Sequence, residues 1–163
     1  MPNNNIEQYR HRLNQVVESH KEVFVIKPVF LKRITNRSMN FVEIYPTARQ
    51  IYLKSKFSHI NPYIEFFEKW KDDTLFEYSY RFVTPFLNFV YAFDGNSSQT
   101  RLNNFQFRYE IHPERSYYNK SHLHFFDNNE WSPHYPTHDI RFPDFFEIIK
   151  REFIKSNKVE FSY

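Results

Sequence analysis

The chain has 163 residues, enough for one domain with a sizeable hydrophobic core, and a formal net charge of +3. It contains no cysteine, which excludes disulfide frameworks and cysteine-ligated zinc sites, and its single glycine, Gly95, excludes the glycine-rich loops that bind phosphates. The mild positive charge permits a nucleic-acid partner or an acidic protein partner but requires neither.

The sequence shows neither a signal peptide nor a membrane span. Residues 1–20 hold no apolar run of the signal-peptide kind, and nowhere do roughly 18 uncharged apolar residues follow one another. We therefore expect a soluble protein with no membrane partner, and the cytoplasm is its default location.

The N-terminal region predicts a helix followed by an interrupted strand. Apolar residues recur at spacings of three and four between positions 6 and 20, which is typical of an amphipathic helix, and Asn5 is its expected cap. Residues 22–34 are rich in β-branched and aromatic side chains. Pro28 lacks the N–H group that a β-ladder needs, so it favours an edge position or a broken strand.

Short strands and a hairpin follow. Residues 39–45 and 49–57 predict two strands separated by a turn at Pro46. The segments 63–70 and 75–82 flank the polar sequence KDDT and predict a β-hairpin, although the first of them also fits a short helix.

The most regular strand pattern covers residues 104–112. Its alternation places Phe105, Phe107, Tyr109 and Ile111 on one face and Gln106, Arg108, Glu110 and His112 on the other. The polar face thus carries a cation, an acid and a base in succession.

The C-terminal region predicts a second helix over residues 141–155. Its apolar stripe consists of Phe142, Phe145, Phe146, Ile149 and Phe153. Pro143 and Asp144 suit its first turn, and Lys150, Arg151 and Lys155 suit its last. We expect this stripe to pack on the face of the sheet that carries Phe105, Phe107 and Tyr109.

These elements predict one α+β domain over residues 1–163. It has an N-terminal helix (1–20), mainly antiparallel strands (22–126) and a C-terminal helix (141–155). The expected architecture is a single antiparallel meander sheet flanked by the two helices.

Histidines concentrate in the last third of the chain, and two of them share one strand. His122 and His124 lie two residues apart in SHLHFF, so in a strand they point to the same face with Cα atoms roughly 6.5–7 Å apart. The short connection makes residues 104–112 and 121–126 neighbouring strands, which would bring Arg108, Glu110 and His112 beside the pair in a surface groove.

Such a group can perform acid–base chemistry on a phosphate, with Glu110 orienting an imidazole and Arg108 stabilising negative charge. A metal role requires a third ligand, for which His112 and Glu110 are the expected donors. The alternative without a function is a solvated sheet face with a cross-strand ion pair.

Residues outside the two strands are expected to bind substrate or to have no essential role. We assign Tyr117, Tyr118 and Arg115 to substrate binding, because aromatic side chains stack on bases in readers of single-stranded RNA, although packing explains the tyrosines nearly as well. His134 and His138 lie in the proline-rich segment SPHYPTHD, where solvated loop histidines without an essential role are expected.

From about residue 75 to residue 153, the order of motifs resembles small bacterial proteins of largely uncharacterised families, among them the TumE-like toxins encoded beside helix-turn-helix antitoxins. The matching positions are Tyr78 and Tyr80, then Arg108, Tyr109 and Glu110, then His122 and His124. The relatives tend to carry paired histidines after the proline of the second motif, where this chain has Glu114 and Arg115 after Pro113. This departure favours a sister family.

The resemblance implies a toxin–antitoxin, mobile-element or defence system, with a helix-turn-helix antitoxin as partner and RNA as substrate. We predict a toxin-like RNA-cleaving enzyme with a catalytic set of His122, His124, Arg108, Glu110 and His112. Metal-assisted cleavage with His122 and His124 as ligands is a variant, but no metal ligand and no cofactor is assigned. The alternative is a non-catalytic module that binds protein or nucleic acid.

Overall fold

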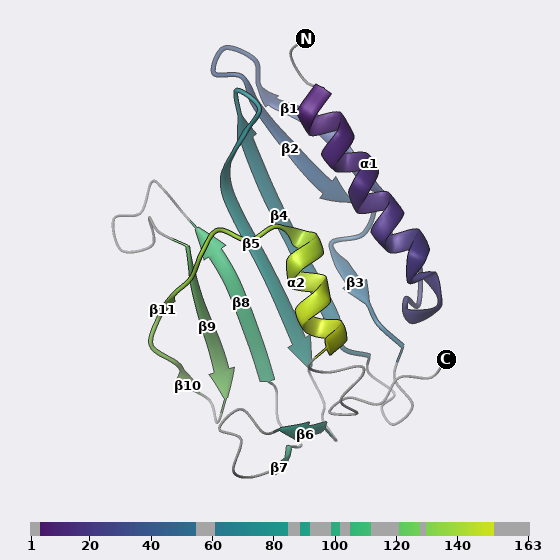
Figure 1. The fold of residues 1–163 in the computed structure, drawn as a ribbon, viewed down its shortest axis with the longest axis vertical. Helices are drawn as coiled ribbons and strands as arrows, with labels where there is room; N and C mark the ends of the chain where they lie inside the picture. The colour runs from purple at the N-terminus through teal and green to yellow at the C-terminus, as the bar shows by residue number, and fades with distance from the viewer. Residues whose placement is uncertain are drawn as a thin grey trace.

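The structure of the protein is a computed structural model that describes residues 4–54, 61–84, 89–91, 99–101, 105–111, 121–127 and 130–151. Within these ranges the fold is α+β, as predicted. Helices α1 (Asn4–Ser19) and α2 (Phe142–Ile149) lie on the same face of a large antiparallel sheet (Figure 1). Neither helix in the described ranges is long and apolar enough to cross a membrane.

The described part of the sheet has nine strands. They are β1 (Phe30–Asn36), β2 (Phe41–Pro46), β3 (Gln50–Tyr52), β4 (Tyr63–Lys71), β5 (Thr74–Thr84), β8 (Phe105–Ile111), β9 (His122–Asp127), β10 (Glu130–Trp131) and β11 (Tyr135–Pro136). Their order is β1-β2-β4-β5-β8-β9-β10, with β3 also pairing with β4 and β11 with β9. Strands β6 (Phe89–Tyr91) and β7 (Gln99–Arg101) form a separate two-stranded sheet.

The N-terminal elements follow the predicted pattern with one correction. The helix begins at Asn4, so Asn5 lies in its first turn and the prediction that it caps the helix is wrong. A 3-10 turn (Lys21–Val23) follows, and β1 begins two residues after Pro28 and lies at one end of the strand order. The prediction of a broken, edge-type strand around Pro28 is therefore confirmed.

The central hairpin is formed by β4 and β5, so the short-helix alternative for residues 63–70 is wrong. Burial alternates strictly along β4, as expected for a strand with one covered face. Asp72 and Asp73 connect the strands with positive φ angles of 50° and 62°. This is the backbone of a two-residue type I′ turn, which aspartate tolerates better than most residues.

The hydrophobic core lies between the sheet and the two helices. The apolar stripe of α2 is buried at Phe142, Phe145, Phe146 and Ile149 against Tyr80 and Phe82 of β5. The ring of Tyr109 lies 6.1 Å from that of Phe145, which confirms the predicted facing for this residue. The side chains of Phe105 and Phe107, and all of residues 152–163, lie outside the described part of the structure.

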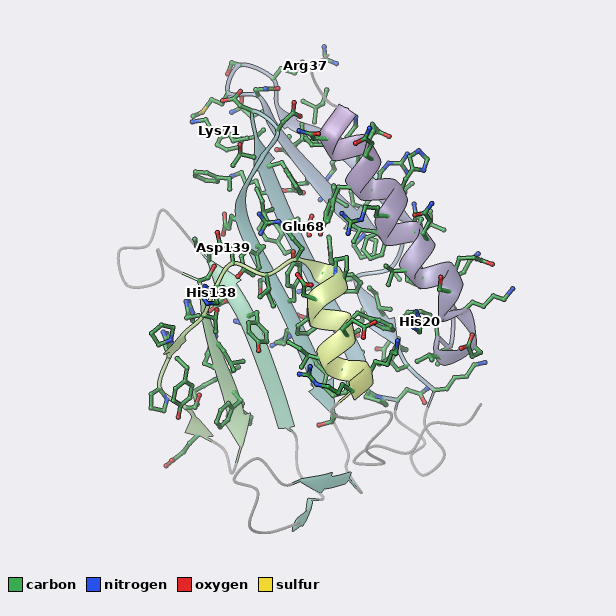
Figure 2. The ribbon with its side chains drawn as sticks, in the orientation of Figure 1. His20, Arg37, Glu68, Lys71, His138 and Asp139 are labelled. Carbon is green, nitrogen blue, oxygen red and sulfur yellow. The ribbon has the colours of Figure 1, made fainter. Side chains whose placement is uncertain are left out.

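The carboxylate of Glu68 is completely enclosed in this core. Glu68 of β4 lies beneath the helices and accepts hydrogen bonds from the Tyr9 hydroxyl (2.5 Å), the Tyr80 hydroxyl (2.5 Å) and the Trp70 indole (3.0 Å) (Figure 2). Burial disfavours the charged carboxylate and raises the pKa of Glu68 to about 7, although the three donors oppose this rise. Glu68 was not among the predicted site residues.

Candidate active site

The predicted neighbours β8 and β9 pair directly. Their antiparallel register places Arg108 opposite His124 and Glu110 opposite His122. Tyr109 and Leu123, which are paired between them, pack towards the core. Because side chains alternate along a strand, the polar set lies on the face of the sheet opposite the helices.

Glu110 joins the two histidines. Its Oε1 atom lies 2.9 Å from Nε2 of His124 and 3.3 Å from Nε2 of His122. An ionised carboxylate can only accept hydrogen bonds, so next to it Nε2 is the donor in both rings. The other carboxylate oxygen, Oε2, accepts a longer bond of 3.4 Å from Nη1 of Arg108.

Glu110, His122 and His124 are buried and do not lie on a solvated face of the sheet. The exposed fractions are 2% for Glu110, 5% for His122 and 6% for His124, so the expectation of a surface groove for the histidine pair is wrong. Arg108 is the more accessible member, with a quarter of its side chain exposed. Its Nε atom is buried without a hydrogen-bond partner among the described residues.

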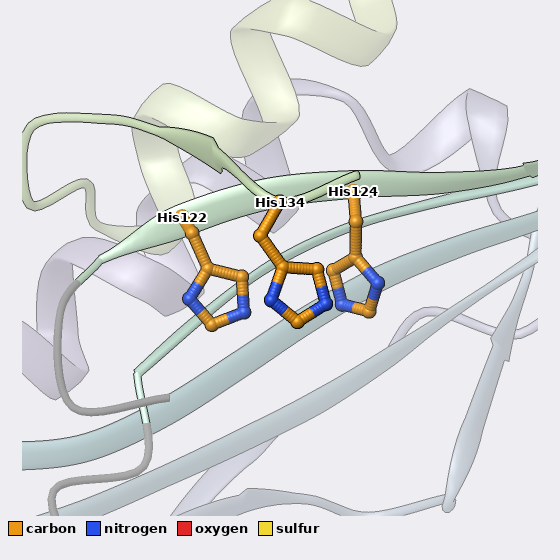
Figure 3. A group of neighbouring side chains, drawn as sticks. All are labelled: His122, His124 and His134. Atoms are coloured by element: carbon orange, nitrogen blue, oxygen red, sulfur yellow. The ribbon is translucent and has the colours of Figure 1, made fainter. Parts of the chain in front are cut away.

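The cover comes from the segment that contains β10 and β11. His134 stacks on His122 with ring centroids 4.5 Å apart and lies 4.6 Å from the His124 ring. Figure 3 shows its ring between the other two. Trp131, which is 45% exposed, lies 4.7 Å from His124 and within cation–π distance of Arg108 at 5.5 Å.

His134 completes this group, although it was not among the predicted catalytic residues. Desolvation by burial, followed by the neighbouring imidazoles of His124 and His122, lowers the pKa of His134 below its usual range. His134 is partly buried, so it is not the solvated loop histidine that was expected. It, and not Glu110, is the third possible metal ligand beside His122 and His124. The other expected donor, His112, lies outside the described residues. His138, four residues further along, is exposed, as expected (Figure 2).

The start of β9 is held by a separate polar chain. The Tyr78 hydroxyl donates to Oγ of Ser121 (2.9 Å), and Ser121 donates to the carboxylate of Asp139. The backbone N–H of Thr137 also donates to the carbonyl of Ser121 (3.1 Å). These bonds fix the returning segment against β9 and so help to position His134.

The remaining predicted residues divide into two groups. Tyr78 and Tyr80 are buried in the core, where their rings stack 4.9 Å apart, and the structure does not bring them to Glu110. His112, Arg115, Tyr117 and Tyr118 lie outside the described residues.

The same sheet face carries a pocket of about 510 Å³ next to this group. Its lining includes Arg33, Arg49, Glu65 and Ser79, and Ser79 is the register partner of Glu110. Between the two lies Arg81, which pairs with Glu65 at 2.5 Å and is the register partner of Arg108. Arginines therefore extend from the histidine group into the pocket, and two of them, Arg33 and Arg81, form ion pairs with Glu43 and Glu65.

Comparison with known proteins adds no relative. No protein-family model matches the chain, and no curated protein or solved structure gives a significant match.

Proposed function

We propose that this chain is a toxin-like enzyme that cleaves RNA at the group formed by Glu110, His122, His124, His134 and Arg108. The observation that carries the proposal is the bonding of two imidazoles to one buried carboxylate, with a guanidinium on its other oxygen. Two imidazoles and one cation are the groups that metal-free phosphodiester cleavage needs.

The reaction is a transesterification. One imidazole takes the proton of the ribose 2′-hydroxyl, and the 2′-oxygen attacks the phosphorus. The bond to the 5′-oxygen breaks, and a protonated imidazole gives its proton to that oxygen. The products are a 2′,3′-cyclic phosphate and a free 5′-hydroxyl, and Arg108 stabilises the charge on the phosphoryl oxygens.

His134 and Trp131 form the accessible side of the site. His134 is only partly buried, and Trp131 presents an exposed indole beside it on which an unpaired base can stack. We assign His134 to one of the two proton transfers, with His122 and His124 linked to it through ring contacts. The pocket with Arg33 and Arg49 offers a path for the rest of the strand.

The biological setting comes from the resemblance to TumE-like toxins. In that setting the protein acts in the cytoplasm as part of a toxin–antitoxin, defence or mobile-element system, and a helix-turn-helix antitoxin is its partner.

The test uses purified protein and a single-stranded RNA with a labelled 5′ end. His124→Ala and His122→Ala should each reduce cleavage about 100-fold or more, and should relieve growth inhibition in cells that lack the antitoxin. His138→Ala, an exposed histidine outside the group, is the matched control, and circular dichroism checks that each variant is folded. Folded histidine variants that cleave at the parental rate would contradict the proposal, and RNA binding without cleavage would favour the non-catalytic alternative.

A further inference from the structure

The three imidazoles of the site have the arrangement of ligands for one metal ion. One ring nitrogen from each of His122, His124 and His134 lies within 4.8 Å of the other two. In a tetrahedral zinc site the ligand nitrogens stand about 3.4 Å apart, as follows from Zn–N bonds of about 2.05 Å. The nitrogens need to approach one another by at most about 1.4 Å to reach this spacing.

Glu110 lies where it can orient two of the possible metal ligands by hydrogen bonds. Metal-bound histidines usually donate their second ring N–H to a carboxylate, which fixes the tautomer and the ring orientation. Here one carboxylate oxygen faces Nε2 of both His122 (3.3 Å) and His124 (2.9 Å). A carboxylate in this position holds both rings in a fixed orientation.

The ligands come from two segments that the fold holds together. His122 and His124 belong to β9, and His134 precedes β11, which pairs with β9 through Tyr135 and Leu123. The third ligand is therefore brought to the site by backbone pairing, and an ion would join the returning segment to the sheet.

We propose that His122, His124 and His134 bind one divalent ion of the zinc type. Imidazole nitrogens suit zinc, copper, cobalt and nickel, whereas magnesium and calcium require oxygen ligands. The inference goes beyond the proposed function and uses the same residues. An imidazole whose lone pair ligates an ion cannot accept the 2′-hydroxyl proton, so the loaded protein is expected to cleave RNA more slowly.

The binding test uses the full-length protein after treatment with a chelator, and needs no RNA. Calorimetric titration with Zn²⁺ should give about one ion per chain, and Co²⁺ should give the visible absorption bands of tetrahedral nitrogen coordination. His134→Ala, which changes a partly buried side chain, should weaken Zn²⁺ binding at least about tenfold. His138→Ala, in the same segment but exposed, should bind as the parent does.

Glu110→Gln tests the positioning role of the carboxylate. It should weaken Zn²⁺ affinity by about 10- to 100-fold without changing the stoichiometry, because it leaves all three ligands in place. Absence of Zn²⁺ binding by the parent, or equal binding by folded His134→Ala, would overturn the metal site.

RNA cleavage gives a separate readout. Cleavage by the chelator-treated parent supports imidazole acid–base chemistry whether or not the ion binds. Cleavage that requires Zn²⁺ would support the metal site and overturn proton transfer by these imidazoles. If Zn²⁺ binds to the three histidines and no form of the protein cleaves RNA, the metal site stands and the proposed function fails.

Discussion

Glu68 and Glu110 are both buried, with exposed fractions of 0% and 2%, but they lie on opposite faces of the sheet. Glu68 pairs with Tyr78 of β5 and Glu110 pairs with the next residue, Ser79, so the alternation of β5 directs the two carboxylates to opposite sides. Glu68 lies under the helices, whereas Glu110 lies under the segment that carries His134.

The difference lies in their hydrogen-bond donors. Glu68 is held by two phenols and an indole, which satisfy its oxygens but bring no positive charge. Glu110 is held by two imidazoles and a guanidinium, which can carry charge and, for the imidazoles, exchange protons. Burial alone therefore does not mark a catalytic carboxylate. What distinguishes Glu110 as the candidate is its titratable partners, together with the partly exposed Arg108 beside them.

The largest expected effect is on RNA cleavage, which should depend on Glu110 and not on Glu68. Glu110→Gln should lower kcat/KM for RNA cleavage by about 100-fold or more, because a neutral amide cannot stabilise the positive charge of a protonated imidazole as a carboxylate does. Glu68→Gln should leave kcat/KM within about twofold of the parent under conditions where it is folded. Equal losses in the two variants would mean that Glu110 acts only through folding.

The second prediction concerns stability and pH. The pKa of Glu68 is raised from 4.5 to about 7 in the folded protein, so between these pH values the folded state keeps a proton that the unfolded state has lost. The contribution of Glu68 to the free energy of unfolding is then full below pH 4.5 and falls by on the order of 3 kcal/mol as the pH rises to about 7.

Urea denaturation at pH 5, 6, 7 and 8 measures this dependence, and Glu68→Gln is the comparison. The variant should lose most of the decline in unfolding free energy between pH 5 and pH 7. A decline of the same size in the variant would assign the pH dependence to other groups.

Removal of one donor to Glu68 should have a smaller effect. Tyr9→Phe deletes one of the three hydrogen bonds and should cost about 1.5–3 kcal/mol of unfolding free energy at pH 8, where the carboxylate is charged. The cost should be smaller at pH 5, because the protonated carboxyl group needs its donors less. Tyr52→Phe, which removes a hydroxyl from an exposed ring, is the control. A loss of unfolding free energy in Tyr9→Phe that does not change with pH would contradict this account of Glu68.

The smallest expected effect follows from removing the hydrogen bond that holds the start of β9. Tyr78→Phe removes the hydrogen bond to Ser121 and should cost about 1 kcal/mol of stability, the usual contribution of a bond between neutral groups. Cleavage by the folded variant should stay within about threefold of the parent, since Tyr78 does not contact Glu110. A loss of cleavage comparable to that of Glu110→Gln would give Tyr78 a direct role in the reaction.

The sequence by itself determined the parts of the molecule that depend on local backbone geometry. Alternation of side chains along a strand placed His122 and His124 on one face and aligned Arg108 with Glu110. A connection of few residues favoured the pairing of the two strands. The stripe of α2, with Pro143 in its first turn, was likewise readable because helical spacing is local.

Only the tertiary structure decided what covers each face of the sheet. The segment around His134 is rich in proline and has no period, so nothing local shows that β11 pairs with β9 and returns the imidazole to the site. Glu68 follows Phe66 on the apolar side of β4, a signal that the sequence did offer, but its partner Tyr9 is 59 residues away. Contacts of this kind depend on the order of strands and on the packing of distant segments, which side-chain periodicity does not encode.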